Sequence, residues 1–596
     1  MAHPSHPHVD PRSYKLDARF FKRVYVLTKP YWVRKGAWKS WLVLVVTLAM
    51  GAALISAGAY ATYLLRDQTN ALVGRRVSEF WYYLFLWMAF GAARFACGQV
   101  QGYLSTRLHL HWRQWLTTEL VDRYLDRRTY YEIANDQLID NPDQRIAAEV
   151  DPFCQTIAML PSGLVTKVTD ATVYIAILMS ISKPLFVFVG AFTVIKTVAV
   201  LWLYKPTIKQ NFDITVSEAD LRYGILHVRD NAETIAFYRG EPAERIQIVE
   251  RLRTAIRRHL TLAVYSVRLN VMQDVLGMGW HLIPVLILAP MFFSHEIEYG
   301  VIAQATAAAG SVLSSFSAVM IFIPLMSRTT PNVVRLAEIH EKFEEMGRAR
   351  QSTAGAPRIA FDAGKTIELD KVSLQTPGGE IKLVSDLSLK VGGQEHLVIV
   401  GRTGVGKSSL LRAMAGLWTR GEGRITMPPP DDALFLPQRP YMVLSDLRSQ
   451  LLYPRHRDDL SDADLQAILE RVNLGDLAER HGGFSAGKDW GRVLSLGEQQ
   501  RIGFARALVA QPRFVFLDEA TSAVDVETER LLYGLLARST ATFVSVGHRP
   551  TLLDYHVKAL RLMPEGKWEI MPARRAQVAE REETTPDGEA TERGAA

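Results

Sequence analysis

The residues whose types and spacing best suit chemistry form a glycine-rich turn. Gly401, Gly406, Lys407 and Ser408 match the phosphate-binding pattern G-x-x-x-x-G-K-[ST], between an apolar run that predicts a strand and a helical pattern. Glycines let backbone N–H groups close around phosphate oxygens, and the helix N-terminus adds a partial positive charge. Lys407 is then expected to reach the β- and γ-phosphates, and Ser408 to bind Mg²⁺. We predict that ATP is bound by Gly401, Arg402, Thr403, Gly404, Val405, Gly406, Lys407, Ser408 and Ser409.

A second element combines an apolar run with two carboxylates. Residues 514–517 are Phe-Val-Phe-Leu and predict a buried strand, which Asp518 and Glu519 follow. Asp518 suits the binding of Mg²⁺, directly or through water. Glu519 is then placed to polarise the attacking water as a general base. Downstream of a phosphate-binding loop, this pattern favours ATP hydrolysis over the simpler interpretation of that loop as a glycine turn between core elements.

Three further polar residues follow predicted strands or begin a predicted helix. Gln438 follows an apolar run and is expected to sense the metal and the γ-phosphate. Ser495 begins a predicted helix, where its hydroxyl and the free N–H groups suit a γ-phosphate. His548 follows another apolar run and is expected to contact the γ-phosphate as a neutral donor. Each alone would be an ordinary structural residue, but together they favour an ATPase. We assign catalysis to Glu519, His548, Lys407 and Gln438, and Mg²⁺ binding to Ser408, Gln438 and Asp518.

The composition indicates a membrane part joined to a soluble part. Of the 596 residues, 48% are hydrophobic, and the mean hydropathy of +0.02 is high for a wholly soluble chain of this length. The net charge of +7 comes from basic residues that form no single stripe, which favours loops beside anionic lipid, and we predict no nucleic-acid partner. The two cysteines imply neither a disulfide framework nor a metal cluster, and the polar N-terminus predicts no cleavable signal peptide.

Six apolar runs are long enough to cross a bilayer as helices. They are Trp41–Leu65, Phe80 to beyond Tyr103, Leu164–Ile181, Leu185–Tyr204, about Val275–Phe293 and about Val301–Leu325. At about 1.5 Å per residue, a run of about 25 residues reaches about 37 Å. Arg34, Lys35 and Lys39 precede the first run and predict a cytoplasmic N-terminus. The long connections after the second and fourth runs are then cytoplasmic. Buried core helices are the alternative, but they explain six such runs poorly.

Polar groups within or near these runs have two interpretations. The groups are Arg94, Lys167, Asp170, Lys196, Asp274 and His281. A charge that faces lipid costs several kcal/mol, so such groups usually face a cavity or a partner. Lys167 and Asp170 are three residues apart and are expected to pair on one helix face. The groups indicate either a polar substrate cavity, for which Arg94 is the best candidate, or structural pairing and snorkelling.

These patterns divide the chain into five parts. We predict a disordered start with an interfacial elbow helix over residues 1–35, a six-helix transmembrane domain over 36–346, a linker over 347–358, an α/β nucleotide-binding domain over 359–573 and a disordered tail over 574–596. Between Tyr14 and Trp32, apolar residues recur at helical spacing with basic residues interleaved. That pattern is typical of a helix that lies in the membrane interface.

In this order the motifs resemble those of ATP-binding cassette (ABC) transporters, from about Tyr14 to Ile570. The resemblance assigns Walker A to 401–408, the Q-loop to Gln438, the signature to 494–498, Walker B to 514–518 with catalytic Glu519, the D-loop to 522–525 and the switch to His548. It implies that two cassettes sandwich ATP with Mg²⁺, each ATP lying between Lys407 of one subunit and Ser495, Gly497 and Glu498 of the other. The resemblance also implies an exporter-type (type IV) membrane fold. One membrane half and one cassette per chain then imply a homodimeric half-transporter.

Two departures from the family pattern concern the nucleotide. Leu496 replaces the first glycine of the usual L-S-G-G-Q, and Glu498 replaces its glutamine. We expect the contacts of Ser495 and Gly497 to survive. In addition, residues 373–377 hold no aromatic residue, although most cassettes stack one on adenine there. Modest ATP affinity or base selectivity is therefore expected.

A narrower resemblance concerns the loops. Residues 138–146, 218–223, 231–240, 437–441 and 447–454 resemble the peroxisomal (ABCD-type) half-transporters and the bacterial BacA/SbmA-related transporters, and Asp489-Trp490 favours the bacterial branch. This implies coupling helices in the two membrane loops, a bacterial inner membrane with the cassette and both termini cytoplasmic, and uptake of peptides or cobalamin-like solutes. The alternatives are translocation of acyl or lipid-like substrates, export of toxic compounds, or a soluble cassette ATPase of translation or DNA repair, which the apolar runs oppose.

Overall fold

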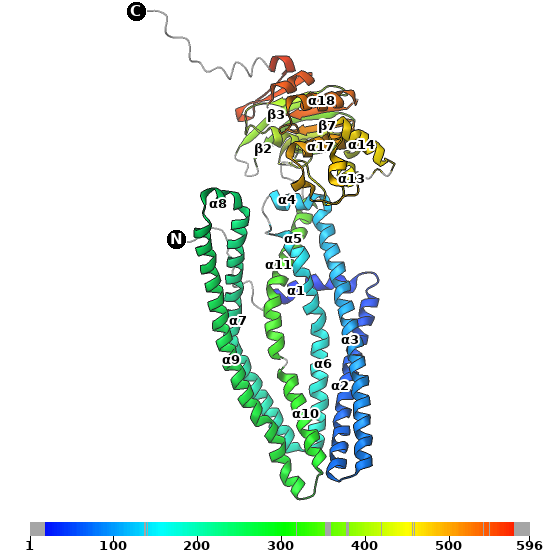
Figure 1. The fold of residues 1–596 in the computed structure, drawn as a ribbon, viewed down its shortest axis with the longest axis vertical. Coiled ribbons are helices and arrows are strands. Elements are labelled where there is room, and N and C mark those ends of the chain that lie inside the picture. The colour runs from blue at the N-terminus through cyan, green and yellow to red at the C-terminus, as the bar shows by residue number, and fades with distance from the viewer. Residues whose placement is uncertain are drawn as a thin grey trace, which may run out of the picture. The chain divides into compact units, whose positions relative to one another are not determined.

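The computed structural model divides the chain into two compact units, residues 1–352 and 353–596. It describes residues 18–135, 139, 141–317, 319–351, 359–376, 381–418, 420–455, 457, 459–539, 541–547 and 549–576. Most of the two predicted disordered ends, residues 1–17 and 577–596, lies outside this set, as does His548. Figure 1 shows long helices in the first unit, and strands with shorter helices in the second.

The described residues of the first unit are organised in helices. They are α1 (Ala18–Val33), α2 (Trp38–Val73), α3 (Val77–Leu125), α4 (Thr129–Asn135), α5 (Pro142–Gln144), a π-helical turn (Arg145–Glu149), α6 (Val150–Ile181), α7 (Lys183–Asp230), α8 (Ala232–Tyr238), α9 (Glu241–Phe293), α10 (Tyr299–Ser317) and α11 (Val319–Gln351). All six predicted apolar runs are therefore helical, as we expected.

Three helical segments of the described chain are both long and apolar enough to cross a membrane. They are Trp38–Val73, Pro142–Ile181 and Lys183–Asp230, and Leu282–Phe293 is a shorter apolar segment. The third of them exposes large apolar side chains, such as Ile195 and Trp202, each 69% exposed. Exposed apolar surface of this extent fits lipid better than water. The membrane character of this unit is thus supported, and the number of six spans stays a prediction.

The helix boundaries define the ends of the predicted runs more closely. Ser182 alone separates α6 from α7, and its hydroxyl accepts a hydrogen bond from the Leu185 N–H at 3.4 Å, so the connection between these two predicted runs is very short. The run predicted as one span over residues 301–325 is helical on both sides of residue 318, which lies outside the described residues, and its two parts are labelled α10 and α11. Helix α11 then continues to Gln351, into the segment predicted as a linker.

The predicted interfacial helix is α1, and an aromatic cluster holds its end against α2 and α3. Tyr31 is fully buried, and its ring stacks on Trp112 with the ring centroids 5.0 Å apart. The Tyr31 hydroxyl lies 3.0 Å from Ser40 Oγ and 2.9 Å from His111 Nδ1. The guanidinium of Arg34 lies 4.3 Å from the Tyr31 ring centroid, in cation–π range. These contacts fix the elbow between α1 and α2.

Two of the polar groups in the apolar runs, Asp170 and Arg94, contact neighbouring helices. Asp170 accepts a hydrogen bond of 2.5 Å from Ser315 Oγ of α10, and the predicted pair with Lys167 is not formed among the described side chains, because α10 packs against that face of α6. Arg94 passes over Gly58, where an added Cβ would lie 2.9 Å from its Nη1 atom. The side chain of His281 lies outside the described residues.

The second unit contains two sheets. Its strands are β1 (Ala360–Ala363), β2 (Ile367–Gln375), β3 (Lys382–Val391), β4 (Leu397–Val400), β5 (Gly421–Met427), β6 (Ala433–Leu436), β7 (Phe514–Asp518), β8 (Thr542–Val546), β9 (Lys558–Leu562) and β10 (Trp568–Pro572). One sheet has the order β1-β5-β2-β3, and the other has the order β10-β9-β4-β8-β7-β6. In the larger sheet all neighbours pair in parallel except β10 with β9. The carboxyl ends of β4, β8, β7 and β6 therefore meet at one edge.

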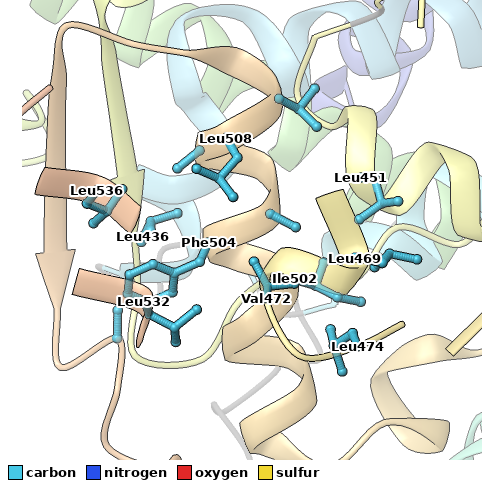
Figure 2. Packing of buried hydrophobic residues seen from close by; sticks show 14 of the residues in the cluster. Leu436, Leu451, Leu469, Val472, Leu474, Ile502, Phe504, Leu508, Leu532 and Leu536 are labelled. Carbon is cyan, nitrogen blue, oxygen red and sulfur yellow. The ribbon is translucent and has the colours of Figure 1, made fainter. Parts of the chain in front are cut away.

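Helices pack on these sheets and bury separate clusters of apolar side chains. The helices are α12 (Lys407–Met414), α13 (Leu447–Leu452), α14 (Asp462–Arg471), α15 (Leu477–His481), α16 (Trp490–Val493), α17 (Leu496–Ala510) and α18 (Val526–Arg538). Figure 2 shows the centre of this packing, where Ile502 and Phe504 of α17 lie among Leu469 of α14 and Leu532 and Leu536 of α18. Helix α17 is thus held on several sides, which gives a rigid base to its N-terminus.

A buried histidine makes the stability of this unit depend on pH. Burial lowers the pKa of His556 to about 4, while its Nε2 and Nδ1 atoms face Ser545 Oγ and the Leu552 carbonyl. The unfolded chain takes up this proton near pH 6.5, so protonation favours unfolding as the pH falls from about 6.5 to about 4. We expect the free energy of unfolding to drop by up to about 3 kcal/mol through this group. Thermal unfolding of the full chain between these pH values, in the wild type and in His556→Gln, measures this loss of stability. The stability of the variant should depend less steeply on pH. Equal dependence in the two proteins would contradict the role of His556.

Candidate ATP-binding and hydrolysis site

The predicted phosphate-binding loop joins β4 to α12. Gly401, Gly404 and Gly406 have φ angles of +142°, +88° and +104°, which side chains other than glycine rarely adopt. At Gly401 an added Cβ would also lie 2.4 Å from the Leu562 carbonyl oxygen. The ammonium group of Lys407 donates to the carbonyl oxygens of Gly401 (2.7 Å) and Arg402 (3.0 Å), so the loop closes around its own lysine. N–H groups and one ammonium thus gather where a phosphate chain would lie.

The two predicted Mg²⁺ ligands meet although they are far apart in the chain. Ser408 Oγ, in the first turn of α12, donates a hydrogen bond of 3.1 Å to Asp518 Oδ1 at the end of β7. Burial raises the pKa of Asp518, the bond from Ser408 opposes this rise, and neighbouring Glu519 adds to it. A cation would favour the ionised form. A hydroxyl and a carboxylate fit Mg²⁺, which in nucleotide sites is held by few protein oxygens together with phosphates and water.

The candidate base is held by the predicted Q-loop residue. Gln438 follows β6, the neighbour of β7, and its Nε2 atom donates to Glu519 Oε2 at 2.9 Å. Glu519 has a φ of +48°, and its N–H donates to the Val546 carbonyl at the end of β8. A left-handed conformation in a residue with a side chain costs of order 1–3 kcal/mol, and such strain is typical of functional sites. The turn aims the carboxylate at the edge where the phosphate-binding loop also lies.

The signature segment forms the N-terminus of α17. Ser495 caps this helix in a capping box, in which its N–H and hydroxyl each donate to Glu498 Oε2 at 2.9 Å. Arg480 donates to the other oxygen, Oε1, also at 2.9 Å. Burial opposes ionisation of Glu498, but the bonds from Arg480 and Ser495 prevail and lower its pKa. Glu498 therefore acts as an anion that orders the signature, and its predicted contact with nucleotide stays a prediction.

A close contact with the predicted D-loop requires a glycine at position 497 of the signature. A Cβ at this position would lie 2.9 Å from the Ala523 carbonyl oxygen of the predicted D-loop. The helix and the D-loop can approach this closely only because position 497 has no side chain. Leu496, which replaces a glycine of the usual motif, is instead 38% exposed and is accommodated without such a contact.

Two charged residues that sequence reasoning missed hold the D-loop. Arg549, next to His548, donates to the carbonyl oxygens of Val524 (2.9 Å) and Ser522 (3.1 Å). It also pairs with the fully buried Glu529 of α18 at 3.2 Å. The carboxylate of Glu529 accepts from Thr521 as well. The sequence did contain a signal for this contact. Glu529 is an acidic residue on the apolar face of a helix, and a buried charge requires partners.

The segment around Gln375, which lacks the usual aromatic residue, is contacted by an aromatic residue from another part of the chain. The Trp418 indole N–H, after α12, donates to the Gln375 carbonyl oxygen at 3.0 Å. Trp418 is partly buried against the core of the sheets. Residues 377–380, the rest of this turn, lie outside the described chain.

The parallel sheet brings most of the predicted residues to one edge. Gly401, Gln438 and Asp518 follow or end the strands β4, β6 and β7, whose carboxyl ends lie together. Ser495 and Gly497 lie on a different element, the N-terminus of α17, beside the D-loop. A glycine-rich loop suited to phosphate, a carboxylate suited to Mg²⁺ and a glutamate held by Gln438 are the parts that ATP hydrolysis requires, in a chain that also has a helical unit with membrane character.

The chain belongs to the ABC transporter family. The family model described as ABC transporter transmembrane region 2 matches residues 27–293, and the model described as ABC transporter matches residues 384–522. An uncharacterised ABC transporter ATP-binding protein of Synechocystis sp. is 39% identical over 542 residues, covering 90% of this chain and 82% of the relative.

Two eukaryotic relatives cover as much of the chain. ABC transporter D family member 2, chloroplastic, of Arabidopsis thaliana is 34% identical over 91% of this chain and 86% of its own length. The human lysosomal cobalamin transporter ABCD4 is 30% identical over 94% of this chain and 97% of its own length. The predicted resemblance to the ABCD-type transporters is thereby confirmed, and the protein is an ATPase coupled to transport.

Proposed function

We propose that this protein is a homodimeric half-transporter of a bacterial inner membrane that uses ATP to take up a cobalamin-like solute or a peptide. The proposal of a cobalamin-like solute rests on the similarity of this chain, over nearly its whole length, to a human protein named as a cobalamin transporter. The proposal of a peptide as the solute rests on the resemblance of the loop motifs to BacA/SbmA-related transporters. One membrane unit and one cassette per chain support the homodimer.

The contacts of these side chains support a proposed role in hydrolysis for each of them. Lys407 and the N–H groups of its loop bind the phosphates, and Ser408 and Asp518 would hold Mg²⁺, which neutralises the charge of the transferred phosphoryl group. Glu519 accepts the proton of the attacking water. Gln438, hydrogen-bonded to that carboxylate, holds it in place until the nucleotide arrives. The signature of the second subunit would cover the γ-phosphate through Ser495 and Gly497.

ATP binding would close the two cassettes, and phosphate release would let them part. Helix α8, between the long helices α7 and α9, lies in a segment that the family resemblance gives to a coupling helix. Its Phe237 and Tyr238 are 79% and 83% exposed, as expected for aromatic side chains that dock on another surface. Such docking would transmit cassette closure to the membrane helices.

Uptake in a deletion strain tests this function. We expect labelled cobalamin or a member of a peptide panel to accumulate faster when the wild-type chain is restored. Glu519→Gln, which removes only the candidate base, serves as the matched control and should not accumulate the solute. If neither solute accumulates faster, uptake is excluded, and faster loss of a preloaded compound would favour export. Carbonate washing of membranes is a separate check, because release of the chain into the supernatant would contradict a membrane protein.

A further inference from the structure

A buried glutamine of α17 connects three loops of the hydrolysis site. Gln500 is 1% exposed. Its Nε2 atom donates to the carbonyl oxygen of Gln438 (2.9 Å) and to Ser522 Oγ (3.0 Å), and its Oε1 atom accepts from the Ala523 N–H at 3.0 Å. One carboxamide thus joins the signature helix to the Q-loop and to the D-loop, and all of its hydrogen bonds are made outside its own helix.

The same contacts lead directly to the candidate base. Gln438, whose backbone Gln500 holds, donates through its side chain to Glu519 Oε2. Ser522, which Gln500 also holds, donates its N–H to the Glu519 carbonyl at 3.0 Å. Gln500 therefore holds two residues that contact Glu519, one at its side chain and the other at its backbone carbonyl. A buried network of this kind, with its partners satisfied, rigidifies the groups that it connects.

We propose that Gln500 is a positioning residue for ATP hydrolysis, which keeps Gln438 and the D-loop in register with Glu519 and itself contacts no nucleotide. The inference rests on the proposed role of Glu519 as the base. Because Ser495 caps α17, the same helix that presents the signature also sets the position of the catalytic carboxylate. Movement of the signature helix would then change the geometry of hydrolysis.

Gln450 provides a matched control for the effect of losing a buried carboxamide. It is 0% exposed, and its side chain also makes three hydrogen bonds, accepting from the Val443 N–H and donating to the carbonyl oxygens of Val443 and Asp446. These partners lie in the loop just before its own helix, α13. Gln450 and Gln500 therefore resemble each other in burial and in number of bonds, but only Gln500 reaches the groups around Glu519.

The test compares Gln500→Met with Gln450→Met in the purified full chain reconstituted in lipid. Methionine keeps the length and removes the hydrogen bonds. We expect Gln500→Met to lower kcat for ATP about tenfold, since small misplacement of catalytic groups has large effects, and to leave KM for ATP within about twofold. Gln450→Met should lose similar thermal stability while kcat stays within about twofold of wild type.

Two outcomes would overturn the proposal. One is an equal loss of kcat in both variants at equal loss of stability, which would make Gln500 an ordinary core residue. The other is an unchanged kcat in Gln500→Met. If Gln500→Met does not fold, Ser522→Ala removes one of the three contacts and should lower kcat by a smaller factor, again at constant KM, and wild-type kcat in it would count against the proposal. Failure of the uptake assay with normal ATPase activity would contradict the proposed substrate and leave this result standing.

Discussion

Replacing Glu519 by glutamine should lower the rate of ATP hydrolysis by a factor of about 10² to 10⁴, the usual contribution of a positioned general base. The substitution keeps the shape of the side chain, and the amide can still contact Gln438, which now lies 2.9 Å from the carboxylate. It removes only the capacity to accept a proton from water. ATP should therefore still bind, and the ATP-bound dimer should accumulate because hydrolysis no longer opens it.

Phosphate release and cross-linking of the purified chain measure this prediction. Glu569→Gln is a suitable control, because Glu569 is an exposed residue of β10, on the far edge of the sheet from β6 and β7. It should hydrolyse ATP like the wild type. Normal phosphate release by Glu519→Gln would remove Glu519 from the role of base. A monomer in the presence of ATP and Mg²⁺ would contradict the proposed homodimer.

Replacing Lys407 by alanine should weaken ATP binding about 10- to 100-fold. The Lys407 ammonium is held inside its loop by two carbonyl oxygens and is only 5% exposed. It is thus placed to exchange these partners for phosphate oxygens. Hydrogen bonds to charged groups contribute about 1.5–3 kcal/mol each, and a factor of ten in affinity corresponds to about 1.4 kcal/mol. Hydrolysis at low ATP concentration should fall at least as much as binding.

Equilibrium binding of ATP to the full chain tests the effect of Lys407→Ala. Lys390→Ala controls for the loss of a positive charge, because Lys390 is an exposed residue of β3, the edge strand of the smaller sheet, and pairs with Glu368. It should bind ATP with wild-type affinity. Unchanged affinity in Lys407→Ala would show that the backbone N–H groups alone hold the phosphates, and the loop would lose its proposed lysine contact.

The local elements of the cassette followed from the sequence because their causes are local. Four consecutive apolar residues before Gly401 are β4, and the helix expected after the loop is α12. Ser495 and Glu498 stand three residues apart, which suffices for the capping box that begins α17. Hydropathy alone likewise placed helices over every predicted run of the membrane unit. Neighbouring residues decide such features, so their order in the chain is sufficient.

Helix boundaries and contacts between different helices were harder to predict from the sequence. The sequence predicted a linker from residue 347 onward, whereas helix α11 extends to Gln351. The pair of Lys167 with Asp170 was plausible on one helix, but Ser315 of another helix provides the partner instead. Helix periodicity shows which residues share a face, and it does not show what packs against that face.

By itself, the sequence determined the class of this protein: an ATP-binding cassette joined to apolar helices, with the ATP-binding residues in a recognisable order. Only the tertiary structure decided which side chains meet. Ser408 and Asp518 are 110 residues apart and Gln438 and Glu519 are 81 apart, yet parallel pairing of β4, β6, β7 and β8 brings them to one edge. The roles proposed for Gln500 and Arg549 arose in the same way. A hydrogen bond depends on distances of about 3 Å, and such distances between remote residues exist only after the strands have paired and the helices have packed.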